Sequence, residues 1–296
     1  MIHAGRRLRV TYTGPSGATA VLADSVIGPA TTALGLAAVQ GARRSLHCDV
    51  DVTRHLRPSA QPSMVSILGL SRERSTSIVA EVAQARELSY EQRAAIAAGM
   101  LKIEYGLADQ DLTILANDAI LDARLTGEGV DRPLVIEAVD GRLLWDTLFV
   151  TESRQPTPDN VAEQAGLSKP PAAKPAKTRS VTYKLQGAAE ADALMVFARL
   201  GLAPVYTAEG VRYIAAGAAL LLPPLDLSAA LVPPIEPPGA GGVLKVRTLA
   251  NPGLVAGRQV TLGHVPVKPY RLDGIKLTLS NYRPTWHADL LCRPST

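Results

Sequence analysis

Residues 246–296 read VRTLANPGLVAGRQVTLGHVPVKPYRLDGIKLTLSNYRPTWHADLLCRPST, and this segment decides the fold. Its clearest stretch has hydrophobic residues at every second position, which is the period of an extended strand and not of a helix. One face of the predicted strand carries Ile275, Leu277 and Leu279, and the other face carries Lys276, Thr278 and Ser280. The segment is therefore predicted to form half-buried strands.

Two short motifs predict turns within the same segment. In Asn251-Pro252-Gly253 the proline presets φ, and the glycine is free to adopt a positive φ. Asp273-Gly274 is a second strong turn signal. Strands separated by such turns pair with their neighbours, so we expect a compact antiparallel unit here.

The composition is that of a globular protein. Hydrophobic residues make up 47% and charged residues 20% of the 296 positions, which excludes wholesale disorder. The chain holds 2 Phe and 2 Trp, so its core must be built from Ala, Val, Leu and Ile. The 22 Pro and 24 Gly predict many turns and few long helices. The length suits one large domain or two ordinary ones, and we favour two.

Charge and cysteine usage indicate a protein folded in the cytoplasm. The net charge of +4 comes from Lys and Arg spread along the chain, without the dense block typical of a nucleic-acid-binding arm. Cys48 and Cys292 are far apart and are predicted to be buried, reduced thiols. The first residues show no apolar core of a secretory signal, and the most apolar stretch, residues 214–222, is too short to span a bilayer. We expect no membrane insertion.

The first half of the chain reads mainly as short strands. A strand pair around the turn cluster Gly14-Pro15-Ser16-Gly17 opens it, and Asp140-Gly141 predicts a later hairpin. The predicted strands cover residues 8–13, 18–26, 46–52, 63–70, 101–105, 112–116, 119–125, 134–139 and 142–150.

One stretch between these predicted strands has the clear spacing of a helix. Hydrophobic residues recur at helical spacing at Ile78, Val79, Val82, Ala83 and Leu88, and Ser71 or Ser75 suits the N-cap. A second, short Ala-rich helix is predicted around residues 90–93, ending near residue 99.

The middle of the chain predicts a linker and then a small α+β unit. Residues 157–179 are rich in Pro, Lys and small side chains and cannot bury enough apolar surface to order themselves. After them come a strand at 181–185, a helix at 189–200 and a hairpin of residues 204–207 and 211–214.

The order of several motifs resembles phage tail baseplate hub proteins, relatives of the contractile-tail hub and of the hub part of type VI secretion spike proteins. The closing segment carries the apolar-Asn-Pro turn, the strand Gly257-Arg258-Gln259-Val260, Tyr270-Arg271, and Trp286 followed by Leu290, Leu291 and Cys292. Earlier come LKIEYGL (101–107), LTILAND (112–118) and GEGVDRPLVIEAVDG (127–141). The chain departs from the family at residues 113–116, where Phe-x-Gly is usual and Thr-Ile-Leu-Ala stands.

The resemblance implies a mainly β fold with α+β insertions: two tube-type β-barrel domains and a small α+β unit. It divides the chain into a first barrel with a helical insertion (1–155), a linker or long loop (156–179), the α+β unit (180–240) and closing strands of the second barrel (241–296). It also implies a homotrimeric ring in the virion tail baseplate, assembled in the host cytoplasm. The ring would join the six-fold tail tube protein to the three-fold central spike protein, contact other baseplate proteins and allow DNA to pass.

The sequence predicts no enzyme and no cofactor. Carboxylates on expected helices or turns are interpreted as solvated surface charge; they are Glu81, Glu87, Glu91, Asp109, Asp111 and Asp118. A tail enzyme that degrades peptidoglycan, and a lumen protein that contacts DNA, are the alternative functions. Trp145 and Trp286 are predicted to lie in the core or at subunit contacts, not to stack on a base or sugar.

Metal and phosphate sites are not expected either. His47, Cys48 and Asp49, with His55 nearby, would suggest a metal, but strand alternation sends Cys48 to the face opposite its two neighbours. His264 and His287 have no partner at a readable spacing and are predicted to be surface or interface residues. The Gly-rich residues 239–242 lack the spacing of a phosphate-binding loop.

Overall fold

The structure is a computed structural model of the chain. It describes residues 6–27, 46–56, 61–87, 99–107, 110–129, 132–140, 201–207, 210–215, 217–233, 242–263, 269–283 and 285–295. Several predicted features lie outside these residues: the linker at 156–179, the helix at 189–200, the strand at 142–150, the short helix around 90–93, and Glu91, Asp109, Trp145 and His264.

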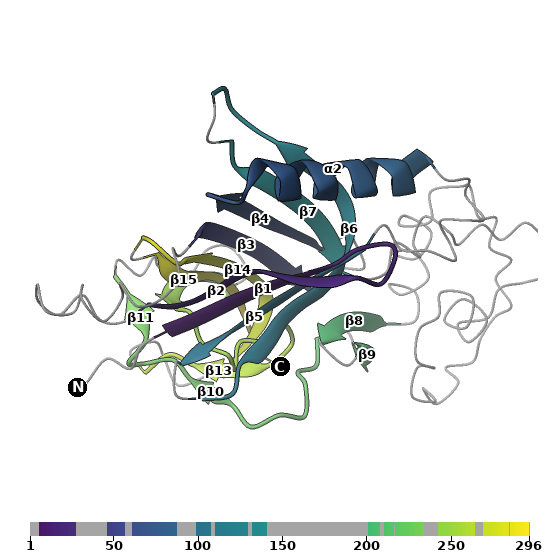
Figure 1. Cartoon of the computed structure of the whole chain (residues 1–296). Helices are drawn as coiled ribbons and strands as arrows, with labels where there is room; N and C mark the ends of the chain where they lie inside the picture. Colours follow the sequence, from purple (N-terminus) through teal and green to yellow (C-terminus); the bar gives the residue numbers. More distant parts are fainter. Residues whose placement is uncertain are drawn as a thin grey trace, which may run out of the picture.

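The described part is mainly β (Figure 1). Its first half contains β1 (Arg6–Thr13), β2 (Thr19–Ile27), β3 (His47–His55), β4 (Pro62–Leu68), α2 (Arg72–Glu87), β5 (Met100–Leu107), β6 (Thr113–Leu125) and β7 (Leu134–Asp140). Its second half contains β8 (Leu202–Thr207), β9 (Gly210–Ala215), β10 (Leu225–Asp226), β11 (Leu231–Val232), β12 (Leu244–Leu249), β13 (Gln259–Thr261), β14 (Tyr270–Ser280) and β15 (Trp286–Pro294).

One 13-stranded sheet joins the two ends of the chain. Its main path runs β11-β12-β15-β14-β3-β4-β7-β6-β5-β1-β2, and β13 and β10 extend from β14 beside this path. All neighbours on the main path are antiparallel, whereas β10 and β13 are parallel. The predicted hairpin of residues 204–214 is confirmed as the separate pair β8–β9.

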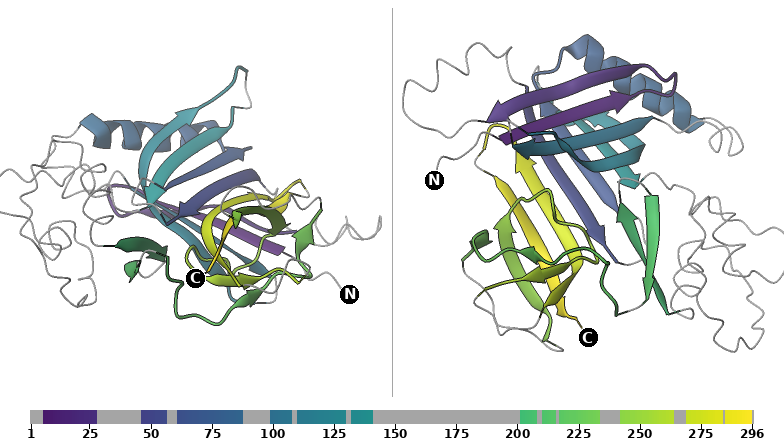
Figure 2. Two further views of the ribbon diagram at one scale, coloured as in Figure 1. Left: turned by 180° about the vertical axis from the view of Figure 1, so that it is seen from behind. Right: turned by 90° about the horizontal axis from the view of Figure 1, so that it is seen from below.

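The sheet curls strongly, as a half-barrel. Figure 2 shows β1, β2 and β5 crossing the direction of β3, β14 and β15. The rings of Tyr105 on β5 and Trp286 on β15 have centroids 6.5 Å apart, although five strands separate β5 from β15 along the sheet. Only a curled sheet brings these strands together, and the apolar side chains inside the curl form the core. Large, fully buried members include Leu8, Ile67, Leu101, Ile103, Leu272 and Leu277.

Asn281, in the turn after β14, links both limbs of the curl. Its side-chain Oδ1 accepts a hydrogen bond from the Cys48 backbone N–H at 2.7 Å, and its Nδ2 donates to the Leu46 carbonyl and to Ser25 Oγ at 3.0 Å. Cys48 belongs to β3 and Ser25 to β2, which is the last strand at the other end of the sheet path. This one amide therefore bridges strands that are far apart in sheet order.

The predicted helix and its cap are confirmed. α2 begins at Arg72, and Ser71 Oγ accepts the Arg74 backbone N–H at 3.3 Å, as an N-cap does. The helix buries Ile78 and Val82 as predicted, together with Ser75 and Ala85. It packs against β6 and reaches β1, where the Tyr12 hydroxyl donates to Glu81 Oε2 at 3.0 Å.

The prediction of separate strands at 112–116 and 119–125 is wrong. These residues form the single strand β6, which pairs with β5 through its first half and with β7 through its second. A register shift occurs in each pairing, so the strand bends as it changes partner. Polar Asn117 and Asp118 look like a break in the sequence, but they lie within a continuous strand.

The predicted turn at Asp273-Gly274 is also wrong. Both residues lie inside β14, where the pairing with β15 shifts register between Leu272 and Gly274. Before this bulge β14 pairs with β13, and after it with β3, so the extra residue lets the strand change neighbours. The carboxylate of Asp273 accepts hydrogen bonds from both Arg271 and Arg293.

The turn at Asn251-Pro252-Gly253 is confirmed. The Leu254 N–H donates to the Asn251 carbonyl at 3.0 Å, and the Gly253 N–H donates to Asn251 Oδ1 at 2.8 Å. The positive φ of this region occurs at Gly257 (88°), not at Gly253. A Cβ at Gly257 would meet Val205, Leu220 and Ile214 at 3.2–3.4 Å, so glycine also allows close packing there.

The described strands do not separate into two barrels. β14, which belongs to the predicted second barrel, pairs with β3 of the predicted first barrel over residues 274–280. A mainly β fold is therefore established, whereas the division at 155, 179 and 240 stays a prediction.

Candidate functional site

The metal-like cluster on β3 separates as the alternation predicted. Cys48 is fully buried in the core, whereas the ring of His47 stacks on Tyr282 at 4.5 Å. Asp49 lies on the same face as His47 and accepts the Tyr282 hydroxyl at 2.6 Å. In the part of the chain that the structure describes, no group of three or more His, Cys, Asp or Glu residues is placed to hold a metal.

Both cysteines are buried free thiols, as the sequence predicts. Burial raises the pKa of Cys292 to about 12 and raises the pKa of Cys48 further. Neither sulfur therefore ionises near neutral pH, and neither is an accessible nucleophile.

We expect both thiols to be inert towards an aromatic disulfide reagent in the native protein at pH 8. The thiolate is the reacting form, and burial both suppresses it and blocks access. Absorbance of the released thiolate should show almost no reaction until guanidinium is added, and then two equivalents per chain. Rapid native labelling at either cysteine would contradict the burial of that residue.

Among the predicted surface carboxylates that the structure describes, Asp118 is the exception. Glu87 and Asp111 are exposed, and Glu81 is half-buried between Tyr12 and Ser77. Asp118 instead lies in strand β6 with an exposed fraction of 2%. Its interpretation as solvated charge is wrong, because a strand long enough to continue past it carries the side chain into the sheet.

A buried network surrounds Asp118. Arg54 Nη2 donates to both carboxylate oxygens at 2.8 and 2.9 Å, and the Ser63 hydroxyl makes a short hydrogen bond to Oδ2. The other end of the guanidinium donates to the carbonyls of Thr53 and Gln61. Both carboxylate oxygens thus accept hydrogen bonds from structural partners, which does not suit a general acid or base.

Trp286 is a core residue, as one of the two sequence interpretations had it. It is 4% exposed, and its Nε1 donates to the Ser280 carbonyl at 2.6 Å. The Arg6 guanidinium lies over its ring at 5.6 Å from the centroid. A buried, hydrogen-bonded indole is not free to stack on a nucleic-acid base.

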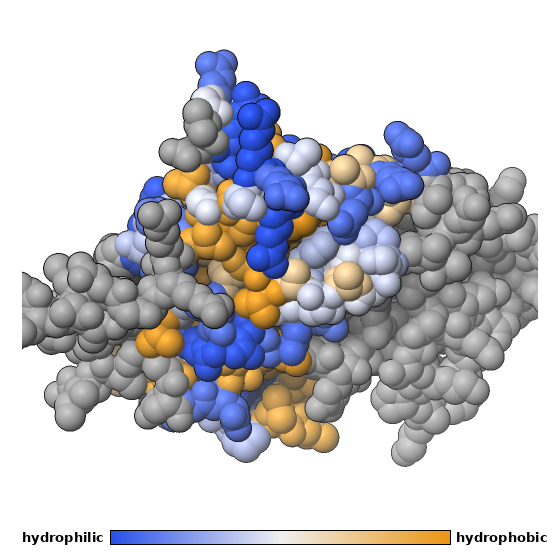
Figure 3. All heavy atoms as spheres, in the orientation of Figure 1, coloured by the Kyte–Doolittle hydropathy of each residue, from blue (hydrophilic) through white to orange (hydrophobic). Residues whose placement is uncertain are grey.

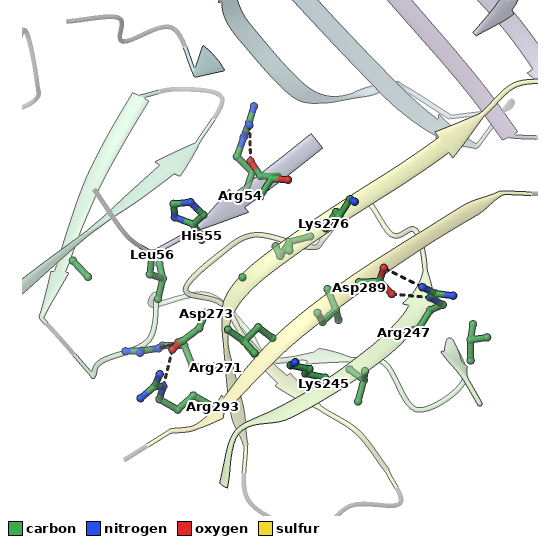
Figure 4. Close-up of a pocket in the computed structure, with 18 of the residues that line it drawn as sticks. Arg54, His55, Leu56, Lys245, Arg247, Arg271, Asp273, Lys276, Asp289 and Arg293 are labelled. Carbon is green, nitrogen blue, oxygen red and sulfur yellow. Dashed lines mark hydrogen bonds and ion pairs between the residues drawn. The ribbon is translucent and has the colours of Figure 1, made fainter. Parts of the chain in front are cut away.

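A basic groove lies on the face of β12, β15, β14 and β3 opposite their core side chains (Figure 4). Its volume is about 1000 Å³. Its charged lining residues are Arg54, Lys245, Arg247, Arg271, Asp273, Lys276, Asp289 and Arg293; Leu56, Leu291, Val232 and Pro233 are among its apolar ones. Cations therefore outnumber carboxylates along the lining.

The carboxylates of the basic groove are already paired. Arg247 contacts Asp289 at 2.7 Å, while Arg271 and Arg293 share Asp273 at 2.7 and 2.8 Å. The hydrogen bond from Arg247 lowers the pKa of Asp289, with smaller contributions from neighbouring charges that include His287 and Lys276. The carboxylate of Asp289 therefore stays ionised to a lower pH than that of an unpaired aspartate.

The sequence interpretation missed this groove. The signal was present: Lys245 and Arg247 alternate with buried Leu244 and Val246, just as Lys276 alternates with buried Ile275 and Leu277. Each of these two runs gives its strand one polar face. The pairing of β12 and β14 with β15 brings the polar faces side by side, since Arg247 opposes Asp289 and Asp289 opposes Lys276.

The fold matches solved phage tail proteins. No protein-family model matches the chain, and no curated protein matches it either. The 43 kDa tail protein of prophage MuSo2 from Shewanella oneidensis superposes with a TM-score of 0.57 at 8% identity over 98% of each chain. A tail protein from Neisseria meningitidis MC58 gives 0.55 at 12% identity over 98% of this chain and 96% of that one.

A third similar structure connects the fold to secretion. The c3393 protein of E. coli gives a TM-score of 0.54 at 9% identity over 87% of this chain and 76% of its own. It is described as a component of the type VI secretion system with structural similarity to the T4 tail proteins gp27 and gp5. The chain therefore has the fold of phage-tail and related secretion proteins, and the resemblance read from motif order is confirmed at the level of fold.

Proposed function

We propose that this chain is a structural tail protein, a baseplate hub that forms a homotrimeric ring between the tail tube and the central spike. The observation that carries the proposal is the curled antiparallel sheet, a fold shared with tail proteins. Among the described strands, the path of this sheet ends at β2 and β11, which have open outer edges. Within the described strands, β2 pairs only with β1 and β11 only with β12. Open edges of this kind pair readily with another chain.

β2 supports this assembly better than β11 does. It spans nine residues, whereas β11 spans two. It contains neither Lys nor Pro, and it exposes Val21 and Val26 at 48% and 50%. Figure 3 shows the surface of the molecule around β1 and β2, where hydrophobic residues lie between charged ones. A neighbouring copy would cover the open edge and these valines together.

A structural role also fits the chemistry of the described residues. Two carboxylates are buried among the described residues, and both have partners: Asp118 is held by Arg54 and Ser63, and Glu104 contacts Lys102 at 2.8 Å. Both cysteines are inside the core. The described helix, α2, lacks the length and apolar character needed to cross a membrane. We extend the proposal to location in the tail baseplate and to contact with the tube, the spike and other baseplate proteins.

Light scattering of the purified chain should give three times its 31.2 kDa mass. Val26→Lys should shift the protein towards the monomer by about tenfold or more in dissociation constant, because a buried lysine on a paired edge is unfavourable. Met64→Lys is the matched control: Met64 is 39% exposed but lies on β4, inside the sheet path. A wild-type monomer that binds neither tube nor spike protein would refute the proposal.

A further inference from the structure

We propose that the basic groove binds an extended acidic peptide segment of another tail protein. That the partner is a tail protein rests on the proposed function, whereas the recognition of an acidic peptide rests on the groove itself. Figure 4 shows basic side chains around the groove, carried by several strands of one sheet face.

The exposed cations are the first reason. Lys245, Arg247 and Lys276 are exposed, and the side chain of Arg293 is 55% exposed. Among the described residues, Lys245 and Lys276 form no salt bridge, whereas the two arginines already have carboxylate partners. The groove therefore holds two ammonium groups that form no salt bridge among the described residues, and each can receive a ligand carboxylate. Lys276 lies opposite Asp289 in the sheet, so Lys245 is the lysine farther from a carboxylate of its own strand pair.

The bulge in β14 lies at the floor of the basic groove. Gly274 lies opposite Leu291 on one side and His55 on the other, and it has no side chain to fill the space between the flanking cations. An added Cβ would lie 3.5 Å from Leu291 Cβ and 3.9 Å from His55 Cβ, both ordinary contacts. Gly274 therefore leaves room at this point of the groove, where a side chain of a ligand can lie.

The mixed lining favours a peptide over a nucleic acid. Leu56, Val232 and Pro233 offer apolar contact to an aliphatic side chain. Asp273 and Asp289 neutralise arginines of the lining, so the groove presents separate lysines and not the continuous row of free cations that suits a polymer with a phosphate at every unit. A peptide can place its acidic residues at the two lysines and its apolar residues over Leu291, so it avoids both carboxylates.

Fluorescence polarisation with three labelled probes tests this inference. The probes are a peptide of alternating Asp and Leu, the same peptide with Lys in place of Asp, and a single-stranded oligonucleotide. We expect the acidic peptide to bind best and to weaken with added salt, since the contacts are partly exposed charge pairs. Equal binding of the Lys peptide, or tighter binding of the oligonucleotide, would overturn the inference.

Three variants locate the binding. Lys245→Glu combined with Lys276→Glu should weaken the acidic peptide by about tenfold or more, because two attractive charges become repulsive. Arg72→Glu combined with Arg132→Glu makes the same change in net charge at exposed positions outside the groove and should leave binding within about twofold. Gly274→Leu fills the floor of the groove without changing its charge and should also weaken binding. Unchanged binding by this variant would show that the peptide does not bind at Gly274.

Light scattering on the same samples separates the two proposals. A trimer that ignores the acidic peptide refutes the groove assignment and leaves the hub proposal standing. A monomer that binds the peptide in a manner dependent on Lys245 and Lys276 refutes the ring and retains the groove.

Discussion

Replacing Asp118 by Ala is expected to lower the free energy of unfolding by about 3–5 kcal/mol, the cost of leaving a buried charge without its partner. Arg54 would keep its bonds to the Thr53 and Gln61 carbonyls but lose both bonds to the carboxylate. Its side chain is 11% exposed, so water replaces the lost partner poorly. Urea unfolding followed by circular dichroism, at one fixed protein concentration, measures the change.

Two further variants separate charge from packing at this site. Asp118→Asn retains the shape of the side chain but removes its charge, and it should still be strongly destabilising. Arg54→Met combined with Asp118→Leu removes both charges, and it should recover much of the lost stability because no unpaired ion remains. A loss below about 1 kcal/mol for Asp118→Ala would show that this ion pair is not buried as described.

Replacing Trp286 by Ala is expected to cost about 3–5 kcal/mol as well, through loss of buried area and formation of a cavity. The indole packs near Tyr105 and under Arg6, so it contacts both limbs of the curled sheet. Its Nε1 bond to the Ser280 carbonyl at 2.6 Å is lost too. Circular dichroism during urea unfolding reports the effect without depending on tryptophan emission.

Tyr282→Ala is the matched control for Trp286. Tyr282 stacks on His47 but is 40% exposed, so its removal should change stability by less than about 1 kcal/mol. Trp286→Phe should fall between the two variants, because it retains an aromatic ring but not the hydrogen bond. Equal losses at positions 282 and 286 would contradict the curl that brings β5 against β15.

The spacing of hydrophobic residues and the positions of turn-forming residues predicted much of the local structure. Alternation located β3, β5 and β14, and helical spacing together with Ser71 located α2. Order of motifs pointed to the tail-protein fold without a matching family model. The errors fell at Asp118 and at Asp273-Gly274, where a polar residue or a turn-forming pair lies within a continuous strand.

Those errors have one physical cause. Asp and Gly favour turns when nothing else holds the backbone, but a strand with partners on both sides stays extended and absorbs the extra residue as a bulge. Asp118 likewise became buried because Arg54, 64 residues earlier, supplies the compensating charge. Local sequence carries no information about such partners.

The sequence by itself located several strands, among them β3 and β5, the apolar faces of these strands and the start of α2, because these depend on period and on neighbours within a few positions. Only the tertiary structure decided that both chain ends share one sheet, that Trp286 meets Tyr105 across its curl, and that cations from β12, β14 and β15 form one groove. Such contacts join residues distant in the chain, and their register is set by the packing of the whole sheet.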